Sequence, residues 1–166
     1  DDAILGVARD AHMAILIGET LGHLGQSALL AEVFNRVEGD APPVNLDAEK
    51  KHGRFILENA AWVTACTDLS DGGLALAAFE MAEEAGVGVS LDTDDTATLF
   101  GEDQARYLVA CNFDQAEALM AAAGNAAVPV ACVGSFGGMT VRFGNSQAEL
   151  ADLSKIFRSS FAAALT

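Results

Sequence analysis

The most informative stretch of the chain is Val63-Thr-Ala-Cys-Thr-Asp-Leu-Ser-Asp-Gly-Gly-Leu-Ala-Leu-Ala-Ala-Phe-Glu-Met-Ala82. An apolar, β-prone run breaks at two glycines and continues as an Ala- and Leu-rich helical pattern, which predicts a strand, a tight turn and a helix. The first N–H groups of such a helix have no partner within it. Either a bound phosphate or the side chain of Ser70 or Asp71 satisfies them, and the turn by itself favours the capping side chain.

The same alternation of strand and helix patterns continues on both sides of this stretch. Strands are predicted at 13–18, 62–67, 87–91, 107–111, 128–134 and 140–143, and helices at 28–35, 46–59, 74–85, 114–123 and 150–164. Gly137-Gly138 predicts a hairpin between the last two strands, because adjacent glycines permit positive φ at both central positions of a turn. The pattern therefore predicts an α/β (α+β) sandwich with a mixed β-sheet flanked by helices. We expect residues 1–12 to be a residual linker and residues 13–166 to form a single domain.

The composition excludes several classes of protein. Nine basic and 24 acidic residues give a net charge of -15, which argues against nucleic-acid binding and disfavours phosphorylated ligands unless dipoles, a metal ion or another domain supply positive charge. Neither a membrane span nor a secretory signal is predicted. The three separated cysteines, Cys66, Cys111 and Cys132, are expected to be buried free thiols, which indicates a cytoplasmic protein.

Three polar segments stand at the edges of predicted strands: 22–27, 68–73 and 101–106. If they converge at one end of the sheet, they offer backbone donors for a phosphate, carboxylates for a magnesium ion and an amide for a substrate. The alternatives are plainer. Glu102, Asp103 and Arg106 would form only a solvated face with a weak ion pair, and Asp68 would only tie down its own turn.

Established catalytic templates are absent from the sequence. There is no nucleophile elbow, no paired-histidine zinc motif and no Walker-type phosphate loop. His12, His23 and His52 are scattered and are expected at the surface or in loops. His23 lies in the 22–27 segment, which we call the glycine loop, and is the histidine worth testing against a ligand. No catalytic residue is assigned to this chain.

Four segments, taken in order, resemble the C-terminal region of the phosphoribosylformylglycinamidine synthase family, the synthetase subunit of formylglycinamide ribonucleotide amidotransferase. They are Ile17-Gly-Glu-Thr-Leu-Gly-His-Leu-Gly-Gln-Ser27, Glu38-Gly-Asp-Ala-Pro-Pro-Val44, Thr67-Asp-Leu-Ser-Asp-Gly-Gly-Leu74 and Leu99-Phe-Gly-Glu-Asp-Gln-Ala-Arg-Tyr107. The resemblance runs from about Met13 to Leu165. It implies a C-terminal domain like that of aminoimidazole ribonucleotide synthetase, which belongs to the same superfamily.

The resemblance also implies a reaction in purine biosynthesis. ATP activates the formyl amide oxygen of formylglycinamide ribonucleotide, and ammonia delivered from glutamine displaces it, with magnesium neutralising the developing charge. ATP and Mg²⁺ would be held mainly by domains absent from this chain. The implied partners are the N-terminal synthetase domains, the glutaminase subunit and the small-molecule ribonucleotide, and self-association into a homodimer is a further possibility. The chain alone is expected to be inactive.

The resemblance assigns possible binding roles to ten residues. Asp68 would be a metal ligand; the phosphate- and substrate-binding residues would be Gly25, Gln26, Ser27, Ser70, Gly72, Gly73, Glu102, Asp103 and Gln104. Many members have His before this Asp, whereas Thr67 stands here. Two alternatives are a structural or dimerisation module without ligand contacts and a C-terminal domain of another superfamily member, such as aminoimidazole ribonucleotide synthetase.

Overall fold

The computed structural model describes residues 6–164, with side chains as far as residue 160. One seven-stranded sheet runs through the molecule in the order β2-β4-β1-β5-β3-β6-β7. Its strands are β1 (Met13–Ile17), β2 (Ala65–Asp68), β3 (Val89–Leu91), β4 (Tyr107–Cys111), β5 (Val130–Phe136), β6 (Thr140–Phe143) and β7 (Ser146–Glu149). Neighbouring strands are antiparallel except β3 and β6, which are parallel, so the mixed sheet is confirmed.

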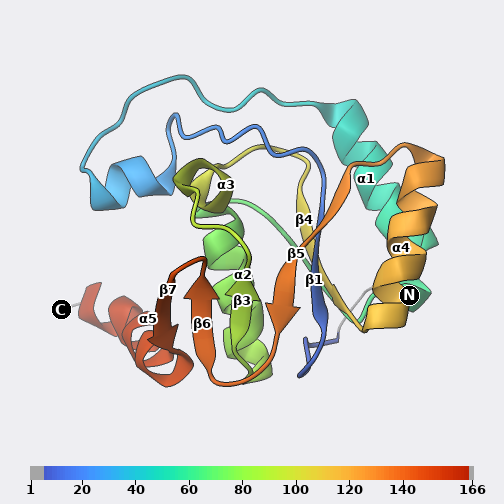
Figure 1. Ribbon diagram of the computed structural model, residues 1–166. Helices are drawn as coiled ribbons and strands as arrows, with labels where there is room; N and C mark the ends of the chain where they lie inside the picture. Colours follow the sequence, from blue (N-terminus) through green and yellow to red (C-terminus); the bar gives the residue numbers. More distant parts are fainter. Residues whose placement is uncertain (1–5, 165–166) are drawn as a thin grey trace.

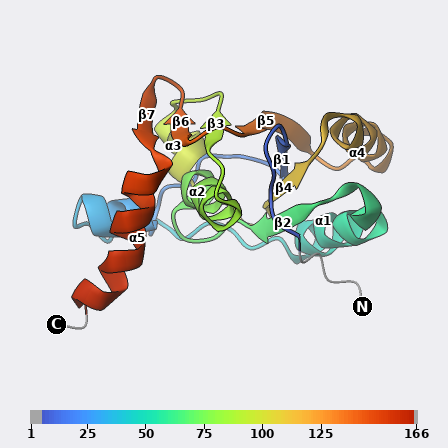
Figure 2. The same ribbon diagram turned by 90° about the horizontal axis from the view of Figure 1, so that it is seen from below.

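Helices cover both faces of one half of this sheet (Figures 1 and 2). The helices are α1 (Leu46–Glu58), α2 (Gly73–Ala85), α3 (Thr96–Phe100), α4 (Phe113–Ala126) and α5 (Leu150–Ala164), with short turns at Leu29–Val33 and Ala60–Trp62. Figure 2 shows α2 on one side of β1 and β4, and α1 and α4 on the other. None of the helices in the described part of the chain is long and apolar enough to cross a membrane.

The period-two pattern of the central strands explains this arrangement. In β1, Ala14 and Leu16 pack in the apolar cluster around α2, whereas Ile15 and Ile17 pack in a second cluster with α1 and α4. Successive side chains of a strand point to opposite faces, so a strand that is apolar throughout must be covered on both. All four side chains are at most 4% exposed, and burial of each large one contributes about 1.5–3 kcal/mol.

The predicted hairpin at Gly137-Gly138 is wrong. Strand β3 lies between β5 and β6, antiparallel to β5 and parallel to β6. The two glycines pair instead with Gly88, whose N–H donates to the carbonyl of Gly138 and whose carbonyl accepts from the N–H of Gly137, both at 2.8 Å. The actual hairpin joins β6 to β7, a strand that the sequence pattern did not reveal.

Three other local expectations differ from the structure. The helix predicted at 28–35 is a single wide turn over Leu29–Val33, and Trp62 belongs to a 3₁₀ turn rather than to the strand that follows it. Cys111 is buried as predicted, but Cys66 is only half-buried and Cys132 is exposed. An apolar run identifies a strand but not whether both of its faces are covered, and the β5 segment around Cys132 is largely uncovered.

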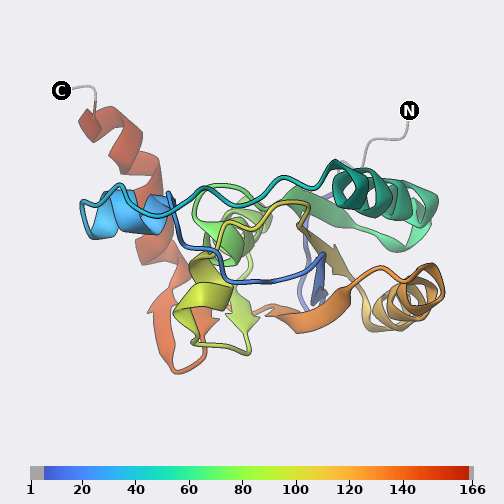
Figure 3. The ribbon, with the colours of Figure 1, turned by 90° about the horizontal axis from the view of Figure 1, so that it is seen from above.

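Ala8, in the predicted linker, is buried, and Asp10 accepts a 3.2 Å hydrogen bond from the N–H of Gly138. The segments that follow β1 and precede α1 cross the same end of the sheet as α3 and the 101–106 segment (Figures 1 and 3). The three polar segments, whose convergence the sequence left open, therefore do converge, and hydrogen bonds among them show how this is achieved.

Candidate functional site

Glu102 joins the three converging segments. Its Oε1 atom accepts hydrogen bonds of 2.8 Å from the N–H groups of Ala28 and Gly72, and its own N–H donates to the carbonyl of His23 at 2.9 Å. One half-buried carboxylate thus satisfies a donor in the glycine loop and a donor in the turn before α2. An anion does occupy one backbone donor of this turn, the N–H of Gly72, and it belongs to the protein itself.

The turn before α2 is capped differently from the sequence-based expectation. Helix α2 begins after Gly72, which has a left-handed conformation with φ of 79°, and no side chain of the turn caps it. Ser70 and Asp71 are both exposed, and Glu102 from a distant segment binds the N–H of Gly72 instead. Gly73 is required by packing, since a Cβ there would lie 2.5 Å from the carbonyl oxygen of Gly101.

Asp103 binds the first part of the glycine loop. Its Oδ2 accepts from the N–H groups of Leu21 and Gly22, both at 2.9 Å, and its Oδ1 accepts from the N–H of His23 at 3.2 Å. The residue is 4% exposed. Three consecutive backbone donors converge on one carboxylate, which is the arrangement of an anion-binding nest already filled by a side chain.

Arg106 supplies the positive charge beneath this carboxylate. Its guanidinium is 1% exposed and donates to the carbonyls of Asp103 and Gly101 and to the hydroxyl of Thr20, while one nitrogen lies 4.0 Å from Oδ2 of Asp103. Burial lowers the pKa of Arg106, and the charge of Asp103 opposes that shift. The solvated-face alternative is therefore wrong, and we refer to Glu102, Asp103 and Arg106 as the carboxylate cluster.

The remaining loop residues of the predicted site are also tied to the protein. Ser27 is fully buried, and its hydroxyl accepts from the N–H of Leu30 at 3.3 Å. The exposed Gln26 donates through its side chain to the carbonyl of Gly39 at 2.8 Å. Gly25 packs so closely on the carbonyl of Asp40 that a Cβ would lie 2.2 Å from it. Gly25 and Gln26 therefore contact the 38–40 loop, whereas Ser27 binds the turn that follows it.

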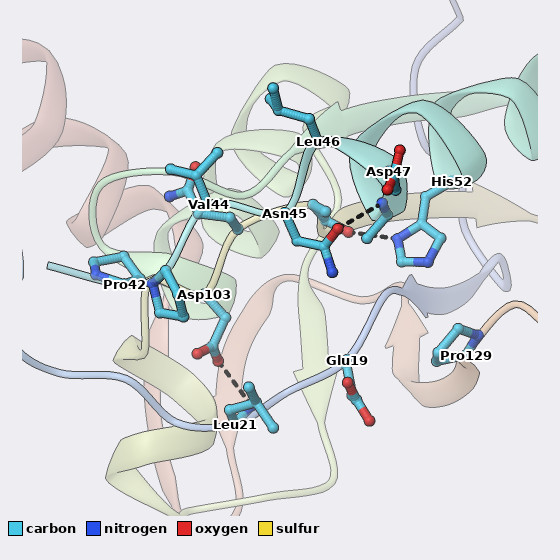
Figure 4. A pocket seen from close by; sticks show the side chains of 14 residues that line it. Glu19, Leu21, Pro42, Val44, Asn45, Leu46, Asp47, His52, Asp103 and Pro129 are labelled. Atoms are coloured by element: carbon cyan, nitrogen blue, oxygen red, sulfur yellow. Dashed lines mark hydrogen bonds between the residues drawn. The ribbon is translucent and has the colours of Figure 1, made fainter.

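Beside the carboxylate cluster lies a cavity of about 730 Å³ between the loop that leads into α1 and the segment after β1 (Figure 4). Gln104 and Asp103 are on its wall, so part of the predicted site opens into it. The full lining comprises Glu19, Leu21, Pro42, Pro43, Val44, Asn45, Leu46, Asp47, Ala48, His52, Asp103, Gln104, Ala105 and Pro129. Its size is typical of small-molecule sites.

His52 also lines this cavity, contrary to the expectation of a surface or loop histidine. It is 5% exposed, and its Nδ1 lies 2.8 Å from the carbonyl oxygen of Ala105. His52, Phe55 and Ile56 form the buried face of α1. That spacing of three and four residues was the signal in the sequence, because residues at these intervals share one helix face. His12 is likewise buried, whereas the ring of His23 binds the carbonyl of Asp40 at 2.7 Å.

Asp68, the predicted metal ligand, is exposed at the end of β2. Its register partner in β4 is Tyr107, whose hydroxyl donates to Glu49 and whose pKa is raised, first by burial and then by that bond. Burial, with a contribution from the charge of Asp68, raises the pKa of Cys66 to about 11. Within residues 6–164, no group of three His, Cys, Asp or Glu side chains is placed to hold a metal ion.

The mixed sheet, covered by α2 on one face and by α1 and α4 on the other, and the glycine-bearing loops gathered at one end define a class of α/β domains. Within that class, residues 11–139 match the family described as AIR synthase related protein, C-terminal domain. The chain belongs to this family.

Curated relatives agree with this placement. The chain is 68% identical over 165 residues to "Phosphoribosylformylglycinamidine synthase subunit PurL" of Roseobacter denitrificans, covering 99% of the chain and 23% of that protein. It is 40% identical to the protein of the same name from Brucella ovis, covering 96% of the chain and 22% of that protein. The chain thus spans less than a quarter of the length of these relatives.

Solved structures show the same fold. "T. maritima PurL complexed with FGAR" superposes with a TM-score of 0.71 at 17% identity, covering 90% of the chain and 29% of that structure. A thiamine-monophosphate kinase from Stenotrophomonas maltophilia gives 0.59 at 19% identity, covering 86% and 53%. The fold is therefore shared with proteins of other names. The 68% sequence identity shows that the chain is more similar to the synthase subunit from Roseobacter denitrificans than the fold alone would indicate.

Proposed function

We propose that the chain is the C-terminal domain of the purine-biosynthesis ligase that converts formylglycinamide ribonucleotide, ATP and glutamine to formylglycinamidine ribonucleotide, ADP, phosphate and glutamate. The observation that carries this proposal is 68% identity over 99% of the chain to a protein named as a subunit of that synthase. The chain corresponds to 23% of that relative, so the rest of the enzyme lies in other domains. The isolated chain is inactive in this proposal and works in the cytoplasm as part of the complete enzyme.

Nucleotide and magnesium are bound mainly by those other domains. Structures named "T. maritima PurL complexed with ATP" and "T. maritima PurL complexed with ADP" support a nucleotide-binding enzyme. Asp68 would be one ligand of a metal ion completed by those domains, because among the described residues it belongs to no group of three or more His, Cys, Asp or Glu side chains. The partners are the N-terminal synthetase domains and a glutaminase subunit, and a structure titled "Structure of PurLQS from Thermotoga maritima" supports assembly with other subunits.

One surface of the domain is suited to such a neighbour. An apolar groove of about 470 Å³ runs between α2, β6 and α5, beside the turn at Leu29–Val33. Ile156 on α5 is 65% exposed and Val33 is 68% exposed, while Phe157 packs edge-on against Phe79 with ring centroids 5.4 Å apart. Exposed apolar surface of this kind marks an interface. We assign it to the rest of the same enzyme, and a homodimer is the alternative.

The carboxylate cluster favours a second, structural role for the predicted site loops. Glu102 and Asp103 occupy backbone donors that a phosphate would otherwise use. In this candidate function the loops shape the domain without contacting nucleotide or substrate. The predicted site residues whose side chains are still open to a ligand are Asp68, Ser70 and Gln104, which are all exposed.

Reconstitution of the complete enzyme from this chain and the upstream domains tests the proposed function, and two variants distinguish ligand binding by the loops from a purely structural role. The isolated chain should show no ATP hydrolysis with formylglycinamide ribonucleotide and ammonia, and co-expression with the upstream domains should restore it. Turnover by this chain alone would refute the proposal. In the complete enzyme, Asp68→Ala and Ser27→Ala distinguish the two roles: changed nucleotide occupancy at unchanged melting temperature indicates ligand binding, whereas a lower melting temperature at unchanged occupancy indicates structural support.

A further inference from the structure

His52 presents an unused hydrogen-bond acceptor to the cavity beside the carboxylate cluster. A backbone carbonyl only accepts, so the 2.8 Å contact between Nδ1 and the oxygen of Ala105 requires the proton on Nδ1. In the neutral ring Nε2 is then a lone-pair acceptor. It makes no hydrogen bond to any residue that the structure describes, and it is not among the fully enclosed polar atoms that lack a partner, so it is open to the cavity even though the residue as a whole is only 5% exposed.

The other polar groups of the cavity also favour a donor. Glu19 and Asp47 carry carboxylates on its wall, and the lining within the described residues contains neither Lys nor Arg. Figure 4 shows Asp47 and His52 on α1 and Glu19 on the segment after β1, and both acidic residues are exposed. The carboxylate of Asp103 is already bound by three N–H groups and cannot serve as the main ligand. The amides of Asn45 and Gln104 and the first turn of α1 also line the cavity, but the ionised side chains on its wall are all negative, which disfavours a negatively charged ligand.

The rest of the wall is apolar. Pro42, Pro43 and Pro129, with Leu21, Val44 and Leu46, give the cavity the mixture of apolar surface and few polar groups that is usual in small-molecule sites. The matching ligand has an apolar body and a group that both carries positive charge and donates several hydrogen bonds. Amidinium and ammonium groups meet these requirements.

We propose that this cavity binds a small organic cation, an amidinium or ammonium group on an apolar body, with Nε2 of His52 accepting a hydrogen bond from it and Glu19 supplying countercharge. The site is distinct in chemistry from the phosphate-binding role proposed for the glycine loops, and it does not depend on the ligase activity of the complete enzyme.

The test compares two probes of the same shape and opposite charge. Benzamidine carries N–H donors and a positive charge, and benzoate has the same ring with a carboxylate. At pH 8, titration of the chain with each is followed by long-range ¹H–¹⁵N spectra of the three histidine rings. We expect His52 in the Nδ1–H form without ligand, a shift of its Nε2 resonance with benzamidine, and at least about tenfold weaker binding of benzoate, which corresponds to about 1.4 kcal/mol. Absence of benzamidine binding, or equal binding of the two probes, overturns the proposal.

Two variants assign the effect to named residues. His52→Asn keeps a donor near the position of Nδ1 but removes the acceptor at Nε2, so the fold should be retained while benzamidine affinity falls at least about tenfold. If that variant does not fold, Glu19→Lys provides the decision: it should abolish the preference for benzamidine. Glu117→Lys on the exposed side of α4 makes the same change of charge away from the cavity and should leave the preference intact. A preference that both lysine variants alter equally, or that neither alters, refutes the site.

Discussion

The carboxylate cluster and the neighbouring cavity share Asp103, yet their polar groups are used in opposite ways. In the cluster, Asp103 and Glu102 accept five backbone hydrogen bonds, and Arg106 is enclosed beneath them. In the cavity, the exposed carboxylate of Glu19 and the Nε2 atom of His52 accept no hydrogen bond from a described residue, and both residues line the open space. Acidic and glycine-rich motifs at one end of a sheet can therefore serve the fold, and the polar groups left over are the better guide to ligands.

The largest loss of stability is expected for a substitution of Asp103, and its size tests whether the carboxylate cluster serves the fold. Asp103→Ala leaves three N–H groups without their acceptor and the buried guanidinium of Arg106 without its countercharge. Removing one partner from a buried charged group costs about 3–5 kcal/mol of unfolding free energy. Urea denaturation of the chain measures it. The exposed Asp71 gives the matched control, because Asp71→Ala should change stability by less than about 0.5 kcal/mol. Equal effects of the two substitutions would contradict a structural role for the cluster.

A smaller loss is expected at Glu102. Glu102→Ala removes the acceptor shared by the N–H groups of Ala28 and Gly72, which should lower the unfolding free energy by about 2 kcal/mol. Hydrogen exchange should accelerate at those two amides before it changes elsewhere. Ser70→Ala should leave both amides protected, because Ser70 does not cap α2. Faster exchange in the Ser70 variant would restore the capping interpretation that the local sequence favoured.

Local patterns predicted the helices and central strands well because those signals lie within a few residues of each other. Asn45 accepts from the N–H of Ala48 at 3.0 Å as a cap of α1, and the strand, turn and helix of residues 65–85 follow the expected pattern. The pairing order was out of reach. Two glycines at 137–138 are compatible with a hairpin between β5 and β6 and also with the observed sheet, in which β3 lies between these two strands. Only the pairing of the complete sheet decides between the two arrangements.

The site shows the same division between local and distant information. The sequence allowed the three polar segments to converge, and in the structure they do. That Glu102 rather than Ser70 or Asp71 binds Gly72 depends on a contact 30 residues away in the chain, which no turn motif encodes. His52 was recoverable from its spacing to Phe55 and Ile56, but a histidine on an apolar stripe does not reveal which nitrogen remains free.

Asp103 is buried with three N–H donors around its carboxylate, whereas the thiol of Cys111 is buried among apolar side chains. Burial should therefore favour the neutral form of this thiol. Cys111 is fully buried among apolar side chains, and burial raises its pKa from 9.0 to about 11. The unfolded thiol ionises first as pH rises, so the unfolded state holds fewer protons and stability falls between pH 9 and 11. The loss attributable to this thiol is about 1.4 kcal/mol at pH 10.

Stability measured against pH in two cysteine variants isolates this effect. Cys111→Ala should flatten the decline between pH 9 and 10 by about 1 kcal/mol, whatever its effect on stability at pH 7. Cys132→Ala, at an exposed position, should leave the decline unchanged. An unchanged slope in the Cys111 variant would show that the thiolate is as well accommodated in the folded chain as in water.

The smallest effect is expected at Asp68, which is exposed and whose carboxylate, unlike those of Asp103 and Glu102, accepts no backbone hydrogen bond from a described residue. In the described residues it has no neighbouring pair of metal-ligating side chains, so the chain alone should bind Mg²⁺ with a Kd of about 10 mM or weaker. At 10 mM MgCl₂ such a site adds less than about 0.4 kcal/mol of stability. NaCl of the same ionic strength is the necessary control, because screening alone stabilises a chain of net charge -15. Asp68→Asn should respond to both salts as the original chain does. A stabilisation above about 1 kcal/mol that is specific to Mg²⁺ and absent from the variant would contradict this expectation. It would show that Asp68 belongs to a metal site that this chain completes by itself.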